Sequence, residues 1–402
     1  MTLVIRLGQH QTKAIVAALG TAQTIAWAST YYLPAILAVP IAAELGLSTV
    51  TIFAAFSLAM VVSALVGPWS GRVIDRSGGR EMLLASNAIF IAGLVLLALV
   101  KGPLLLFVAW AVIGVGMGIG LYEAAFSTLA KIYGRAARAP ITGITLIAGF
   151  ASTIGWPLTA LAEAQFGWRN TCLLWALIHL LLAVPLNFLL PGGGNAGQEA
   201  AGEAAETVGI EPPSRATPSR YAVPVLAFVF AVGWFCSTAM ATHLPRLLEL
   251  TGASTAVAVA AAALIGPAQV AARIAEFGLL RRYHPLISSR LATLMHPIGA
   301  VVLMFFGAPA AYAFTLLHGA GNGVLTIAKG TLPLALFGPA HYGYLQGVIS
   351  APGRILQAFA PLIFGFALEV MGARAIWLTA SLSLLAFLAL MSLRMRPQGQ
   401  GS

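Results

Sequence analysis

The chain has 402 residues, of which 59% are hydrophobic and only 8% are charged. Soluble globular proteins carry about 25% charged residues, so this composition excludes an ordinary soluble enzyme and favours an integral membrane protein. The formal net charge of +10 would suggest nucleic-acid binding in a soluble protein, but basic residues of membrane proteins accumulate in cytosolic loops. We therefore expect a lipid bilayer as a partner of this chain and no nucleic acid.

Apolar segments of span length recur along the whole sequence. A bilayer crossing needs about 20 consecutive, predominantly apolar residues in a helix. Blocks of this kind cover residues 14–38, 50–70, 82–100, 103–129, 140–162 and 171–190, followed by 221–245, 254–280, 288–306, 310–335, 345–368 and 375–394. We therefore predict an all-α membrane protein with twelve transmembrane helices in two bundles of six.

A polar stretch at residues 191–220 separates the two sets of blocks. It is rich in Gly, Ala and Pro and contains four glutamates, a composition typical of a solvated linker. We predict an N-terminal six-helix bundle over residues 1–190, the linker over 191–220 and a C-terminal bundle over 221–402. If the amino terminus is cytosolic, fifteen Lys and Arg residues fall on the cytosolic side and four on the other. The positive-inside rule then places the linker and both termini on the cytosolic side of the membrane. We expect this membrane to be a bacterial inner membrane.

The cysteines and the polar residues show no pattern of an enzyme or of a metal site. Cys172 and Cys236 both lie within apolar blocks, so they form neither a disulfide framework nor a metal-ligand spacing. No Ser/His/Asp set and no His-x-x-Glu-His pair is evident. We expect a protein that is not an enzyme and that needs no cofactor and no metal.

The segment after the second block carries the most specific motif, which reads GRVIDRSGGR over residues 71–80. It closely resembles the G-x-x-x-D-R-x-G-x-R loop of the major facilitator superfamily, and twelve spans with a cytosolic linker fit the same superfamily. The resemblance covers the whole chain and implies a monomeric transporter that works by alternating access. We expect Asp75 to pair with neighbouring arginines or to cap an adjacent helix, a latch that holds one conformational state. The latch residues that we assign are Gly71, Asp75, Arg76, Gly78 and Arg80.

Within that superfamily, two regions resemble the monocarboxylate porter and oxalate–formate antiporter group. The first contains Tyr133, Arg135 and Arg138 and ends in the loop FGWR over residues 166–169. The second reads GPAQVAAR over residues 266–273 and resembles the group's G-x-x-D-x-x-x-R segment, whose arginine holds the substrate carboxylate. The resemblance implies this role for Arg273. Gln269 stands in place of the aspartate, and Ala35 in place of the group's first-span lysine.

Five ionisable residues fall at membrane depth: Glu123, Arg273, Glu276, Lys329 and Arg354. A charge there costs at least about 2.5 to 3.5 kcal/mol, so each requires a partner, a wet cavity or a function. The spacing of Gln269, Arg273 and Glu276 places them on one helix face. Arg273 then either pairs permanently with Glu276 or binds a substrate anion. Arg354 lies at a depth similar to that of the second cation of oxalate–formate antiporters.

Glu123 follows four glycines at alternating positions, Gly114, Gly116, Gly118 and Gly120. These glycines form two interleaved small-xxx-small pairs, which allow close packing of helices. Glu123 is expected about twenty residues into one long helix. It is either a proton-coupling site, a role that we also give to Glu276, or an acid near Lys131 that faces the cytosol.

The tenth block carries a polar stripe of His318, Asn322, Thr326 and Lys329, spaced by four, four and three residues. On a helix these side chains share one face. The stripe either lines the central cavity or joins helices, with Lys329 reaching toward the cytosol. In the first block, Tyr31 offers both a ring and a hydroxyl to a ligand.

Together these features predict a secondary active transporter that moves a small, carboxylate-like organic anion, with proton coupling as a separate hypothesis. The substrate contacts that we assign are Arg273, Gln269, Arg354, Tyr31, Asn322 and His318. A proton-driven exporter of drugs or toxic compounds is the main alternative. The fifth block, which reads GWPLTA over residues 155–160, matches poorly the G-P-x-x-G-G-like turn of such exporters. A membrane sensor without transport activity is a second alternative.

Overall fold

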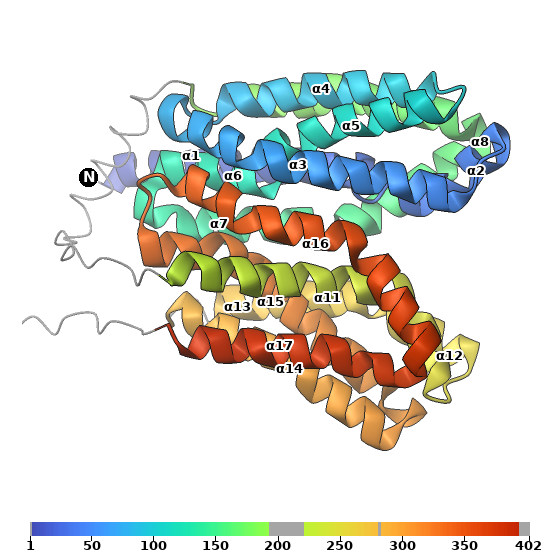
Figure 1. Cartoon of the computed structure of the whole chain (residues 1–402). Helices are drawn as coiled ribbons and strands as arrows, with labels where there is room; N and C mark the ends of the chain where they lie inside the picture. Colours follow the sequence, from blue (N-terminus) through green and yellow to red (C-terminus); the bar gives the residue numbers. More distant parts are fainter. Residues whose placement is uncertain (1, 193–220, 280–282, 394–402) are drawn as a thin grey trace, which may run out of the picture. The chain divides into compact units, whose positions relative to one another are not determined.

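The computed structural model describes residues 2–192, 221–279 and 283–393, and within these ranges the regular secondary structure is helical throughout, with no strand (Figure 1). The prediction of an all-α protein is therefore confirmed. Residues 193–220 of the predicted linker lie outside the described residues.

Eight stretches of the described chain are long and apolar enough to cross a membrane. One of them, Pro103–Phe188, runs for 86 residues and overlaps three of the predicted blocks, and Tyr342–Met391 runs for 50 residues and overlaps two. The membrane character of the chain is thus confirmed, and the number of twelve crossings stays a prediction.

The chain divides into two compact units. Unit 1 comprises residues 1–214 and 338–358, and unit 2 comprises residues 215–337 and 359–402. The long helix α16 (Tyr342–Met371) contributes its first part to unit 1 and its second part to unit 2. The predicted bundles over residues 1–190 and 221–402 stay a prediction.

Unit 1 contains, besides the first part of α16, helices that are often broken within one apolar block. They are α1 (Thr2–Ser29), α2 (Pro34–Leu45), α3 (Thr49–Ser77), α4 (Arg80–Ala98), α5 (Pro103–Gly120), α6 (Tyr122–Tyr133), η1 (Gly134–Ala137), α7 (Arg138–Ala148), α8 (Ala151–Ile178), the π-helical turn η2 (His179–Ala183) and α9 (Val184–Phe188).

Helix α5 packs against both α3 and α4 through its glycines. A Cβ atom on Gly114 would lie 2.6 Å from the carbonyl oxygen of Ala59 in α3, and one on Gly116 would lie 2.7 Å from the ring of Phe90 in α4. The two small-xxx-small pairs therefore serve two different neighbours, and their predicted role in close packing is confirmed.

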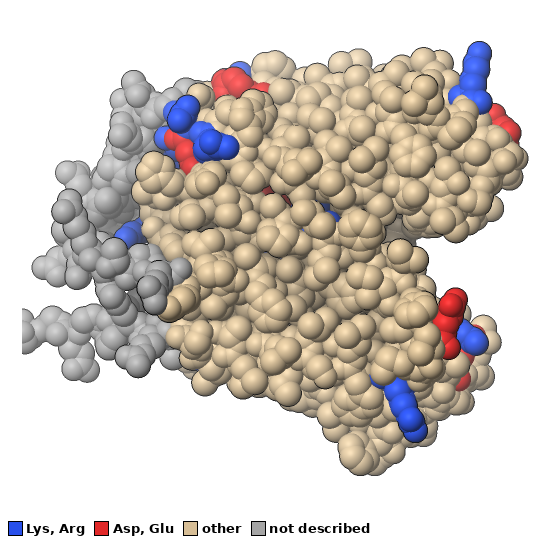
Figure 2. Space-filling view, in the orientation of Figure 1, with Lys and Arg blue, Asp and Glu red and all other residues tan. Residues whose placement is uncertain are grey.

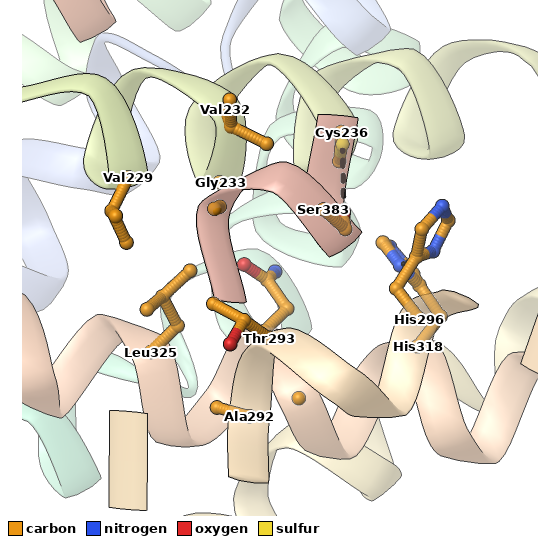
Figure 3. Close-up of a pocket in the computed structure, with 13 residues that line it drawn as sticks. Val229, Val232, Gly233, Cys236, Ala292, Thr293, His296, His318, Leu325 and Ser383 are labelled. Carbon is orange, nitrogen blue, oxygen red and sulfur yellow. Dashed lines mark hydrogen bonds between the residues drawn. The ribbon is translucent and has the colours of Figure 1, made fainter. Parts of the chain in front are cut away.

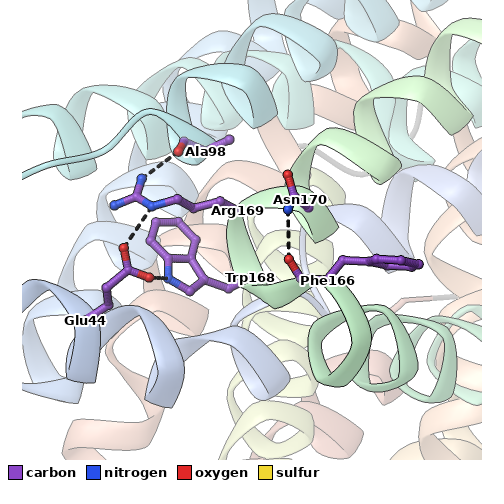
Figure 4. A network of polar contacts seen from close by, with 6 residues as sticks. All are labelled: Glu44, Ala98, Phe166, Trp168, Arg169 and Asn170. Atoms are coloured by element: carbon purple, nitrogen blue, oxygen red, sulfur yellow. Dashed lines mark hydrogen bonds and ion pairs between the residues drawn. The ribbon is translucent and has the colours of Figure 1, made fainter.

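A polar cluster around Arg169 connects three helices of unit 1 (Figure 4). Gly167, at φ 75° and ψ 164°, interrupts the helical path of α8 and directs the next two side chains toward Glu44. Arg169 Nε lies 2.9 Å from Glu44 Oε1, Arg169 Nη1 donates to the carbonyl oxygen of Ala98 at 2.6 Å, and Trp168 Nε1 donates to Glu44 Oε2. The cluster thereby joins the ends of α2 and α4 to α8.

Unit 2 contains, besides the second part of α16, helices of both short and long type. They are α11 (Ala222–Leu250), α12 (Thr255–Ala263), α13 (Ile265–Gly278), α14 (Pro285–Phe306), η4 (Ala308–Ala310), α15 (Ala311–Phe337), η5 (Gly372–Ala375) and α17 (Ile376–Met391). Its core forms around Phe314 and Phe364, which are fully buried.

The outer faces of the helices fit a lipid environment. Figure 2 shows Lys, Arg, Asp and Glu side chains mostly at the ends of the helices and few of them on the flanks between these ends. Leu65, Leu104 and Leu362 each expose more than two thirds of their surface. Soluble monomers rarely expose large contiguous apolar patches, so such flanks indicate contact with lipid.

The close approach of α5 and α3 gives a test of this packing. Gly114→Ala should lower the stability by about 1 to 3 kcal/mol, because the added methyl group meets backbone atoms of Ala59 that have no room to move. The thermal unfolding midpoint in detergent measures the effect. Gly102→Ala is the control, because no atom lies within 4 Å of a Cβ at that position. An unchanged midpoint for Gly114→Ala would contradict the packing.

Candidate functional site

A buried ion pair joins α6 to the first part of α16 in unit 1. Arg354 Nη2, from the first part of α16, lies 2.7 Å from Glu123 Oε2, and the side chains are 3% and 16% exposed. The pair joins two residues that the sequence singled out for different roles, one for substrate binding and one for proton coupling. Lys131, the cation of the alternative reading of Glu123, donates from Nζ to the carbonyl oxygen of Asp75 at 2.7 Å.

The prediction that Glu123 lies within one long helix is wrong. Glu123 lies in the first turn of α6. The helical path breaks at Leu121, whose φ of −84° and ψ of −165° are extended, directly after glycines that favour helix poorly. Gln23 Nε2 donates to the carbonyl oxygen of Gly120 at 2.7 Å and so satisfies a group that the break leaves open. A carboxylate in the first turn is stabilised by the positive end of the helix dipole.

Aromatic side chains from the last turns of α1 and from the residues that follow it lie near Arg354. The Arg354 Cζ atom lies 5.6 Å from the ring centroid of Trp27, within the range of a cation–π contact. Tyr31 packs edge-on against Trp27 at 5.3 Å, and its hydroxyl accepts a hydrogen bond from Gln357 Nε2 at 2.9 Å. The structure thus brings three assigned residues, Glu123, Arg354 and Tyr31, into one region.

A small cavity borders the ion pair. It is lined by Glu123 and Arg354 together with small side chains, namely Ser63, Ala64, Gly67, Gly118, Gly347, Ser350 and Ala351. Small residues at these positions leave room beside the two charges, and they also let α3 approach α16. A Cβ atom on Gly347 would lie 2.6 Å from Cα of Pro68.

Sequence reasoning missed most of the polar face of α16. Gln346, Ser350, Arg354 and Gln357 follow one another at intervals of four, four and three residues, and all are at most 5% exposed. The signal was present in the sequence, because the same spacing revealed the stripe of the tenth block. Of this face, only Arg354 carries a charge, and only it was singled out.

Asp75 caps the beginning of α16. Its Oδ1 and Oδ2 accept hydrogen bonds from the backbone N–H groups of Gly343 at 2.8 Å and Tyr344 at 2.9 Å. These are among the first N–H groups of the helix, which have no partner within it. Gly71 makes this contact possible, because a Cβ at this position would collide with the carbonyl group of Gly343.

The sequence led us to expect a loop at residues 71–80, but most of this motif is helical. Helix α3 continues to Ser77, and Gly78 ends it with a φ of 87° that favours glycine. Arg76 is exposed in the last turn of α3. Arg80 begins α4, and its guanidinium lies 5.4 Å from the ring centroid of Phe188.

The residues assigned from the eighth block lie in unit 2, on α13. The block breaks at Leu264, one turn before Pro267, and Arg273 and Glu276 are 5% and 2% exposed. The backbone of Gln269 packs closely against Gly323 of α15, where a Cβ would lie 2.5 Å from its carbonyl oxygen. Arg273 and Arg354 thus belong to different units.

The polar stripe of the tenth block lies on α15, also in unit 2. His318 and Lys329 are buried, at 4% and 5% exposed, so Lys329 does not extend to the surface. Its Nζ instead lies 3.3 Å from the ring centroid of Trp234 on α11. Asn322 Nδ2 donates to Ser237 Oγ at 2.9 Å.

Long apolar helices, exposed apolar side chains on their flanks and an ion pair buried between them define a multi-pass membrane protein. The chain belongs to the Major Facilitator Superfamily, whose family model matches residues 19–313. Members of this family carry small molecules across membranes and are not enzymes. Among the residues that the structure describes, no group of three or more His, Cys, Asp or Glu side chains is arranged to hold a metal ion.

Known proteins resemble the chain over nearly its whole length. It is 25% identical to an uncharacterized 38 kDa protein in the 23S RNA operon of Thermoproteus tenax. The match extends over 361 residues and covers 89% of each of the two chains. The fold is similar to that of the proton:xylose symporter XylE bound to 6-bromo-6-deoxy-D-glucose, with a TM-score of 0.75, 13% identity and 96% of each chain covered.

Two further structures share the fold. The human organic anion transporter MFSD10 gives a TM-score of 0.70 at 17% identity, covering 95% of this chain and 99% of that one. The E. coli fucose:proton symporter FucP gives 0.69 at 15% identity, covering 95% and 98%. At these identities the likeness establishes the fold and leaves the substrate open.

The cap at Asp75 predicts a local effect on α16. Asp75→Ala removes the acceptors of Gly343 and Tyr344, so these amides should exchange with solvent deuterium faster, and stability should fall by about 0.5 to 2 kcal/mol. Asp75→Asn keeps one side-chain acceptor, so its exchange rate and stability should lie between those of the unaltered protein and of Asp75→Ala. Hydrogen-exchange mass spectrometry of peptides over residues 338–350 measures the effect, with Arg76→Ala as control. Unchanged exchange in Asp75→Ala would contradict the cap.

The ion pair predicts non-additive effects of substitution. Glu123→Gln and Arg354→Gln each leave one buried charge without its main partner, which costs about 3 to 5 kcal/mol. The double variant should lose clearly less than the sum of the two. Thermal midpoints of the four proteins measure this coupling, with the exposed Lys101→Gln as a charge-matched control. Additive losses would show that the two side chains do not interact.

Proposed function

We propose that the protein is a secondary active transporter of a small organic anion, with Arg354 as the positive charge that binds the substrate carboxylate. The observation that carries this proposal is a permanently charged guanidinium, 3% exposed, beside a cavity lined by small side chains. An arginine in this position needs an anionic partner in every state of the transport cycle. When Glu123 leaves, a substrate carboxylate is a suitable replacement.

Glu123 supplies the coupling in this proposal. While it is ionised, it occupies Arg354 and excludes an anion from the site. When it takes up a proton, the ion pair is lost and the guanidinium becomes available to a carboxylate, which forms the same charge-assisted hydrogen bonds. Proton and substrate anion thus bind together, as in a symporter. Arg273 and Glu276 are both buried on α13 in unit 2, and we assign Arg273 to substrate binding and Glu276 to proton coupling there.

The conformational cycle is alternating access, with the Asp75 cap as a latch on α16. We place the protein as a monomer in a bacterial inner membrane, with both termini in the cytosol. Within the superfamily we assign it to the monocarboxylate porter and oxalate–formate antiporter group, on the motifs at residues 133–169 and 266–273. The human protein MFSD10, which shares the fold, is an organic anion transporter, in line with this substrate class.

Export of lipophilic cations is the second candidate, and one observation favours it. Trp27, Tyr31, Tyr32 and Tyr122 form a cluster of rings in contact with one another, a surface on which cations bind well. Glu123 would be the acid that holds such a cation. Its bond to Arg354 weighs against this role, because a carboxylate that is already neutralised attracts cations poorly.

A ligand-binding experiment separates the two candidates. The thermal midpoint of the purified protein should rise with the concentration of one or more carboxylates from a panel of formate, lactate, benzoate and succinate. The rise should disappear in Arg354→Gln and persist in Lys101→Gln. Arg273→Gln reports in the same assay whether the second arginine also contributes. A rise with tetraphenylphosphonium alone, unchanged in Arg354→Gln, would support the exporter instead.

Transport in proteoliposomes tests the coupling. With the carboxylate found above, an inward proton gradient should drive accumulation by the unaltered protein. Glu123→Gln should abolish this pH-driven accumulation while exchange of labelled for unlabelled substrate continues, because the glutamine cannot release a proton. Accumulation that is unchanged in Glu123→Gln would refute proton coupling through this residue.

A further inference from the structure

Two buried serines line the cavity beside the Glu123–Arg354 ion pair. Ser63 of α3 and Ser350 of α16 are 3% and 5% exposed, and both belong to the cavity lining. Within the described residues neither hydroxyl takes part in a hydrogen bond. A buried hydroxyl without a partner costs free energy, so a polar ligand in the cavity would stabilise both side chains.

Other buried serines of unit 1 satisfy their hydroxyl within their own helix. Ser29 Oγ and Ser86 Oγ donate to backbone carbonyl oxygens about one turn earlier, at 2.8 and 2.7 Å, a common partner of a helical serine. Ser63 and Ser350 also lie within helices, yet they form no such bond. Their hydroxyls are therefore available to a molecule in the cavity.

The carboxylate of Glu123 is the third polar group at the cavity. Its Oε2 is bound to Arg354, whereas its Oε1 forms no hydrogen bond with a described residue. The residues that α3 and α5 contribute to the lining are uncharged. Tyr342 of α16 lies close enough to Glu123 for an electrostatic interaction, and no ionisable side chain of the described residues besides Arg354 forms an ion pair or a hydrogen bond with Glu123.

The size of the cavity selects a very small ligand. It measures about 10 Å³, and one ordered water needs roughly 10 to 15 Å³ and two to four polar partners. A carboxylate is too large for this space while the ion pair is closed, and a metal cation would be repelled by Arg354. A water molecule can accept from the serine hydroxyls and donate to Glu123 Oε1, which gives it the partners that it needs.

The cavity of unit 2 lacks these features (Figure 3). It measures about 30 Å³, and none of its lining residues carries a formal charge. Its hydroxyls also have partners in the protein: Ser383 Oγ lies 3.5 Å from Cys236 Sγ, and Thr293 Oγ1 donates to the carbonyl oxygen of Arg290 at 3.0 Å. Open hydroxyls next to a charged pair thus distinguish the cavity of unit 1.

We propose that Ser63 and Ser350 hold one water molecule that passes the coupled proton to Glu123. The inference rests on the proposed role of Glu123 and makes the two serines positioning residues for its protonation. A proton from solvent reaches this water as hydronium. One hydronium O–H bond then breaks, its hydrogen forms a bond with Glu123 Oε1, and the electron pair stays on the water oxygen. The neutral water accepts from the new carboxyl O–H, and Arg354 loses its charged partner.

Infrared difference spectra between neutral and acidic pH test the proposal on the full-length protein in lipid membranes, without a substrate. The C=O band of protonated Glu123 is identified by its loss in Glu123→Gln. It should be accompanied by a water O–H band that shifts in water labelled with heavy oxygen. The water band should be lost in Ser63→Ala and in Ser350→Ala. Ser70→Ala is the matched control and should keep it, because Ser70 is a buried serine of α3 with an unbonded hydroxyl outside the cavity lining.

Exchange of the carboxyl hydrogen gives the rate of proton transfer. When the acidified protein is transferred into heavy water, the C=O band of Glu123 shifts as O–H becomes O–D. This exchange should be about tenfold slower in Ser63→Ala and in Ser350→Ala, because each variant loses a hydrogen bond that holds the water. It should be unchanged in Ser70→Ala. A purely structural role of the serines would lower the thermal midpoint and leave the exchange rate unaltered.

Three outcomes would overturn the proposal: a Glu123 band without a water band, a water band that persists in both serine variants, or exchange in both variants at the rate of the unaltered protein. Each of them leaves the protonation of Glu123 intact. A spectrum without a Glu123 band would instead refute the proton coupling on which the inference rests. The serines lie on different helices, so either variant provides the test if the other does not fold.

Discussion

An arginine in the interior of a membrane protein cannot release its proton, so its charge has to be matched wherever the side chain lies. In unit 1 this constraint applies to Arg354, and several nearby groups stabilise its charge. Glu123 supplies the opposite charge, Trp27 supplies the face of its ring, and the break between α5 and α6 places the glutamate in a first helical turn. Without that break the carboxylate would lose the favourable end of a helix dipole.

The same segment of α16 is held at two points. Asp75 binds its first N–H groups at Gly343 and Tyr344, and Glu123 binds Arg354 eleven residues further along. At 1.5 Å per residue these points are about 16 Å apart on one helix. Gly343, at the first point, and Gly347, between the two, allow backbone contact with α3. A rigid helix held in this way links the two contacts physically, because displacement of the segment would strain both.

The sequence predicted features that depend on composition, period and spacing, and it failed where a feature depends on tertiary contacts. The apolar blocks, the close-packing glycines of α5 and the capacity of Asp75 to cap a helix all follow from local pattern. The pairing of Glu123 with Arg354 spans 231 positions and has no local signature. The break at Leu121 was missed because no proline or turn-type polar residue marks it, and Gln23, which stabilises it, lies on another helix.

The charge count of the unit 1 site limits how it can work. With Glu123 ionised, Arg354 and Glu123 sum to zero, and an added carboxylate would leave a net negative charge inside the protein, at a cost of the kind that buried unpaired charges incur. With Glu123 protonated, Arg354 and one bound carboxylate again sum to zero. A site built on this pair therefore keeps its neutrality only if one proton accompanies each monocarboxylate. Such a cycle moves no net charge, so a pH gradient would drive it and the membrane potential would not.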